Sequence, residues 1–174
     1  MKLRTTLVGA VFVLLALSTS SARSNTITPE DSVQISALGK RVNNLASDLN
    51  QISKSMMLSS GLTHDLICLF EISDQAVNVA HYSYATGIVV HLASVMSNAD
   101  DEMWALVDAQ GTLSALLNAL DTAHNEMNKV AGRCRAPLVY DNAKSILGLT
   151  TEMKIVVAPM LARVQAALPP GIGR

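Results

Sequence analysis

The sequence predicts an all-α fold, an antiparallel up-down-up-down four-helix bundle with long helices. Apolar residues recur in alternating steps of three and four along several long segments, a pattern typical of helices that bury one stripe. Turn signals separate these segments, and short connections make consecutive helices antiparallel neighbours. The chain of 174 residues is one domain's worth and long enough for a sizeable core.

The first 24 residues are typical of a cleaved secretory signal peptide. Lys2 and Arg4 precede an apolar run over 7–17, and small polar residues follow, so that cleavage after Ala22 or after Ser24 fits the pattern. The apolar run is shorter than the roughly 20 residues that span a bilayer, although a single-pass anchor is the alternative. We therefore expect a secreted or periplasmic protein with no stable membrane insertion after cleavage.

The expected mature chain is weakly acidic. Cleavage after Ser24 removes Lys2, Arg4 and Arg23 and leaves 10 of the 13 basic residues against 14 acidic ones, a net charge of about −4. Aromatic residues make up only 3% of the chain. Electrostatic attraction and base stacking are thus both weak, and we expect no nucleic-acid partner.

The first helix of the bundle domain, which spans 25–168, is predicted from about Pro29 to about Leu58. Thr28 is a typical N-cap, Pro29 suits the first helical position, and Gly61 suits the end. The stripe expected to face the core is Ile35, Leu38, Val42, Leu45, Leu49, Ile52 and Met56.

The second helix is predicted from Leu62 or Thr63 to about Ser97, with a break at Gly87 as the alternative. It is apolar almost all round, which is typical of a helix that is deeply buried or meets a partner. The stripe expected to face the core is Leu66, Phe70, Val77, Ala80, Tyr84, Ile88 and Val95. The opposite face, expected to hold a homodimer contact or a partner site, carries Ile67, Ile72, Val79, Val89 and Ala93.

The third and fourth helices repeat the same steps. The third follows an acidic start at 100–102 and ends between Gly132 and Pro137, and the fourth starts near Pro137. The third helix's expected stripe is Leu106, Gln110, Leu113, Leu117, Leu120, His124, Met127 and Ala131. The stripe expected for the fourth helix is Val139, Ala143, Ile146, Thr150, Met153, Val157, Met160 and Val164. Residues 169–174 are expected to form a flexible tail.

A metal site is one open alternative. If the second and third helices turn near Asp101, Asp121 lies level with His81, and His124 follows one helical turn later. Imidazole and carboxylate are common metal ligands, so His81, Asp121 and His124 form a candidate cluster. A histidine hydrogen-bonded at the edge of the core is the simpler interpretation.

Cys68 and Cys134 predict an intramolecular disulfide. Two cysteines with none left over suit an exported chain in an oxidising compartment. Asp101, in the expected turn, lies midway between them, so two antiparallel helices bring them to the same level. The angular position of Cys68, away from the expected core stripe, argues against the bond, and free thiols or an intermolecular bridge remain alternatives.

No chemical motif points to catalysis or to a cofactor. The sequence lacks a Gly-x-Ser-x-Gly elbow, a Cys-x-x-Cys-His haem attachment and a pair of histidines four residues apart. We therefore expect an exported helical binding or interaction protein without enzymatic activity and without a cofactor. A periplasmic metal- or cofactor-binding bundle and a secreted helical enzyme inhibitor are the alternatives.

Overall fold

The computed structural model describes residues 26–96 and 99–171, and over these ranges the protein is all-α, with four helices and no strand. The helices are α2, Pro29–Ser60; α3, His64–Val95; α4, Ala99–Arg133; and α5, Pro137–Ala167. The four long helices expected from the sequence are confirmed. The predicted signal peptide, residues 1–24, lies outside the described residues, and so do 172–174 of the expected tail.

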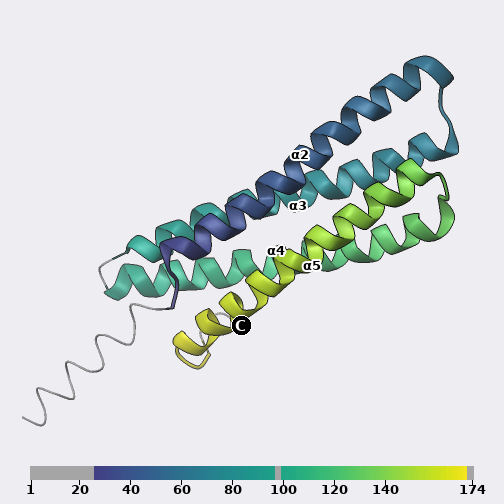
Figure 1. The fold of residues 1–174 in the computed structure, drawn as a ribbon. Coiled ribbons are helices and arrows are strands. Elements are labelled where there is room, and N and C mark those ends of the chain that lie inside the picture. Colours follow the sequence, from purple (N-terminus) through teal and green to yellow (C-terminus); the bar gives the residue numbers. More distant parts are fainter. Residues whose placement is uncertain (1–25, 97–98, 172–174) are drawn as a thin grey trace, which may run out of the picture.

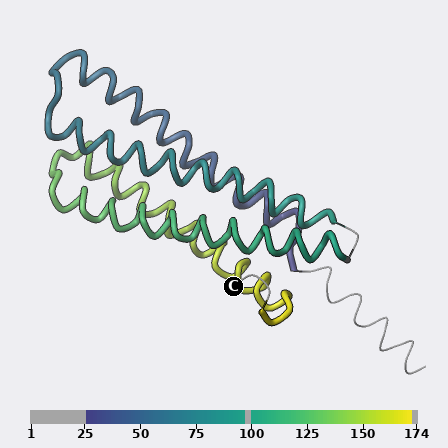
Figure 2. The backbone as a smooth tube through the Cα atoms, turned by 180° about the vertical axis from the view of Figure 1, so that it is seen from behind, coloured from purple at the N-terminus to yellow at the C-terminus, as the bar shows by residue number. Residues whose placement is uncertain are grey.

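Helices α3 and α4 lie side by side along the length of the molecule (Figures 1 and 2). Helix α3 packs along α2 and along α4, and α4 packs in turn along α5. Helices α2 and α5 approach each other less closely. Ion pairs bridge these two helices, Arg41 to Glu152 at 2.6 Å and Arg163 to Asp31 at 2.8 Å. Because exposed pairs contribute about 0–1 kcal/mol each, the packing of successive helices holds most of the fold together.

The ends of α2 and the start of α3 follow from local hydrogen bonds. At the start of α2, the backbone amide of Asp31 donates to Thr28 Oγ1, and the amide of Thr28 donates to the Asp31 carboxylate, which is a capping box. Gly61 ends α2 at a φ of 70°, a conformation that glycine adopts without strain. Thr63 then caps α3 by accepting a hydrogen bond from the amide of Leu66.

The core-facing stripes of three helices are confirmed. In α2 the predicted stripe is buried or half-buried along its whole length, and the same holds for α4. In α5 the buried set is the predicted one, residue for residue: Val139, Ala143, Ile146, Thr150, Met153, Val157, Met160 and Val164. The stripe predicted for the second helix is wrong, as described with the functional site below.

Helices α2 and α3 approach closely because small residues meet at their contact. A Cβ atom at Gly39 would lie 2.7 Å from the Cβ of Ser83, and one at Gly87 would lie 2.6 Å from Ser36 Oγ. The Cβ of Ser83 cannot rotate away, so there is no room for a side chain at Gly39, whereas a side chain at Gly87 would require Ser36 to turn its hydroxyl aside. Helix α3 runs unbroken through Gly87, so this glycine serves close packing and does not divide the helix.

Among the described helices, α5 has the length and the apolar composition to cross a membrane, with a mean hydropathy of 1.4 over its most apolar window. The core helix of a soluble protein meets the same two criteria. Eight residues of α5 are buried in the bundle, which accounts for part of its apolar composition.

Candidate functional site

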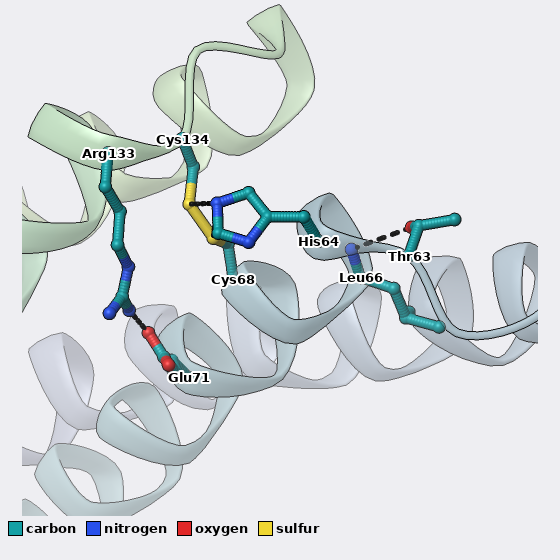
Figure 3. The surroundings of a disulfide bond; sticks show 7 residues. All are labelled: Thr63, His64, Leu66, Cys68, Glu71, Arg133 and Cys134. Carbon is teal, nitrogen blue, oxygen red and sulfur yellow. Dashed lines mark hydrogen bonds and ion pairs between the residues drawn. A yellow bond between two sulfur atoms is a disulfide. The ribbon is translucent and has the colours of Figure 1, made fainter.

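The structure joins Cys68, near the start of α3, to Cys134, just after the end of α4, in a disulfide (Figure 3). The two Cα atoms are 6.6 Å apart, within the range of native disulfides. Both cysteines are fully buried. The bond ties together the ends of α3 and α4 that lie farthest from the α3–α4 connection.

Two further side chains surround the disulfide. The Glu71 carboxylate pairs with the Arg133 guanidinium, a second link between α3 and α4. The imidazole of His64 lies against the sulfur atoms, with Nε2 3.6 Å from Cys134 Sγ and 4.0 Å from Cys68 Sγ. His64 is itself exposed, so its ring covers the buried disulfide from the solvent side.

Within the described residues, His64, Cys68 and Cys134 are the group whose potential metal-ligand atoms lie together, within 4.8 Å of one another. Zinc and copper bind cysteine as the thiolate. The disulfide occupies both sulfur atoms, so this group can offer a metal only the imidazole while the bond is intact.

The structure does not gather the three candidate metal ligands of the sequence into one cluster. The Asp121 carboxylate pairs with Lys154 Nζ of α5 at 2.5 Å. His81 is exposed on α3. His124 is half-buried, and no described residue provides a hydrogen-bond partner for its buried Nδ1. Counting residues from the turn predicts only a level along the helices, and it does not predict the direction of each side chain around its helix.

The predicted partner face of α3 needs correction, because the structure buries most of it. Ile72 and Val79 are at most 1% exposed and Ala93 is 7% exposed, while Val89 is half-buried. Only Ile67 of the five is exposed, at 42%. Ile72, Val79 and Ala93 therefore belong to the core, where they cannot contact a partner.

The two faces of α3 are exchanged relative to the prediction. Of the stripe expected in the core, only Leu66 and Ala80 are buried, whereas Val77, Ile88 and Val95 are 52%, 64% and 55% exposed. The inward face instead combines apolar residues with small ones, among them Ala76, Ala80, Ser83 and Gly87. Cys68 lies on this inward side, which removes the angular objection to the disulfide.

We call the exposed stripe the outer face of α3. All of its residues are solvent-exposed in the structure: Ile67, Phe70, Asp74, Val77, His81, Tyr84, Ile88, His91 and Val95. Six of these nine side chains are apolar or aromatic. Exposed apolar side chains that recur along a whole helix are typical of an interaction site.

A groove between α3 and α4 continues the apolar surface near one end of the outer face. The groove is lined from α3 by Val89, Leu92 and Met96, and from α4 by Trp104 and Ala105 together with two acidic residues, Asp101 and Asp108. Trp104, the single tryptophan of the chain, is 63% exposed. Tryptophan is enriched at protein interfaces. The sequence analysis missed both this residue and the identity of the outer face.

Comparisons with known protein families, with curated proteins and with solved structures find no match to this chain.

Proposed function

We propose that this chain is the precursor of an exported interaction protein, which acts by binding another protein molecule through the outer face of α3 and has no catalytic activity of its own. The observation that carries the proposal is the exposure of that face. Apolar side chains line it from Ile67 to Val95, along almost the whole helix. A monomer gains nothing from exposing such a stripe, whereas a complex buries it.

Three features support export as part of this proposal. Residues 1–24 have the order of a secretory signal peptide. The Cys68–Cys134 bond suits an oxidising compartment. A mature antiparallel up-down-up-down bundle is consistent with the short connections and with the disulfide, which requires the start of α3 and the end of α4 to lie at the same end. Secretion or a periplasmic location follows from this proposal.

Two isoleucines provide a matched test of the binding surface. Ile88 of the outer face is 64% exposed, and Ile155 of α5 is 70% exposed. A photo-reactive amino acid is placed at one or the other position, and the cells that produce the protein are irradiated. We expect cross-linked protein adducts from position 88 and few from position 155. Equal yields at the two positions, or none at 88, would contradict the proposed surface.

A further inference from the structure

The outer face of α3 has the spacing of a coiled-coil seam. Its residues fall into two sets, each repeating every seven residues. The first set is Ile67, Asp74, His81, Ile88 and Val95; the second is Phe70, Val77, Tyr84 and His91. Steps of three and four alternate without a gap over about 42 Å of helix. Such a seam is the surface that a second helix covers in knobs-into-holes packing.

Three polar residues interrupt the seam, and they restrict what can cover it. Asp74, His81 and His91 are exposed in the structure but would be buried beneath a partner helix. A buried polar residue in a seam needs a polar partner at the same level, and this requirement fixes register and orientation. A second α3 in the parallel orientation fails it, because each Asp74 would face the other Asp74.

An antiparallel second copy meets the requirement in one register. Residues of the first set then face residues of the second set. Asp74 faces His91, and His81 faces Tyr84, so a carboxylate meets an imidazole and an imidazole meets a phenol. The apolar residues also face one another, Val77 against Ile88 and Phe70 against Val95. Two-fold symmetry makes each of these four pairs occur twice.

In the two neighbouring registers, the polar residues of the seam do not all face polar partners. A shift by one heptad in one direction sets His81 against Val77 and His91 against Ile67, which buries both imidazoles against aliphatic side chains. A shift in the other direction sets His81 against His91 and removes Asp74 from its imidazole partner. The complementarity of charge and of apolar character therefore selects one register.

We propose that the partner on the outer face is a second copy of this chain, bound as an antiparallel α3–α3 homodimer with Asp74 of each copy against His91 of the other. The inference rests on the surface assigned under the proposed function. It specifies the occupant, the orientation and the register, which that function leaves open.

Sedimentation of the protein purified with its disulfide intact tests the homodimer. At tens of micromolar we expect a dimer. Ile88→Glu should raise the dissociation constant at least tenfold, because it buries a carboxylate against Val77 of the other copy. The matched variant Ile155→Glu should leave the constant unchanged. A monomeric wild-type protein, or a dimer that is indifferent to Ile88→Glu, would overturn the proposal.

A charge exchange tests the register. His91→Asp sets two carboxylates against each other at two sites, and we expect at least a tenfold weaker dimer. Adding Asp74→Lys to this variant restores opposite charges and should return the constant to within a few-fold of wild type. A double variant no better than His91→Asp would overturn the register. Circular dichroism should show unchanged helix content, since both positions are exposed in the monomer.

The two proposals fail separately. A monomer whose position 88 cross-links to a different protein overturns the homodimer and leaves the binding surface in place. A monomer whose position 88 yields no adduct overturns both.

Discussion

Single glycines decide how closely α2 and α3 pack. Gly39→Ala would set a Cβ atom 2.7 Å from the Cβ of Ser83, which cannot rotate away. We expect a loss of about 1–3 kcal/mol in the free energy of unfolding, the usual cost of overpacking. Gly148, in α5, has no atom within 4 Å of its Cβ position. Gly148→Ala should therefore stabilise by about 0.5–1 kcal/mol through helix propensity. Chemical denaturation of the two variants measures both, and equal effects would contradict this account.

The sequence predicts only part of what surrounds the individual candidate residues. Counting residues from the turn predicts a level for Asp121 and His124 along the third helix. It does not predict their surroundings, because Lys154, which pairs with Asp121, comes from α5 and is distant in sequence. The exposure of His64 and its place beside the disulfide likewise depend on a helix start that the sequence located only within a few residues.

At the scale of the elements, α5 and α3 show where sequence patterns succeed and fail. The apolar residues of α5 fall on one clear stripe, so both the helical repeat and the buried face could be predicted from the sequence. Every residue predicted for that face is buried. Helix α3 is apolar almost all round, and its apolar periodicity therefore did not identify the inward face. The usable signal was residue size. Ala76, Ala80, Ser83 and Gly87 mark the side where a neighbouring helix approaches closely.

The disulfide is the main covalent constraint on the α3–α4 pair. It joins residues 66 apart, and on the chain-entropy model a loop of this length stabilises by about 4 kcal/mol. Cys68→Ala combined with Cys134→Ala should therefore lower the free energy of unfolding by several kcal/mol. Glu71→Gln, which removes the neighbouring exposed ion pair, should cost about 1 kcal/mol or less. Two reactive thiols per unfolded, unreduced chain would show that the bond is absent.

At the scale of the whole molecule, none of the described helices covers the outer face of α3. Helix α3 has neighbours on its inward side, yet its outer face stays exposed from one end to the other. The number of helices and their order could be predicted from the sequence, since both follow from local pattern and turn signals. The uncovered face could not, because it depends on how the four stripes close around one core.

Oxidative footprinting of two matched tyrosines tests the central claim, that the outer face of α3 is a binding surface, most directly. Tyr84 of that face is 39% exposed and Tyr140 of α5 is 38% exposed, so in the isolated chain they should react at similar rates. Hydroxyl-radical labelling within the producing cells, followed by mass spectrometry, gives the ratio of their modification. We expect Tyr84 to be protected several-fold relative to Tyr140. Equal modification of the two tyrosines would contradict the account.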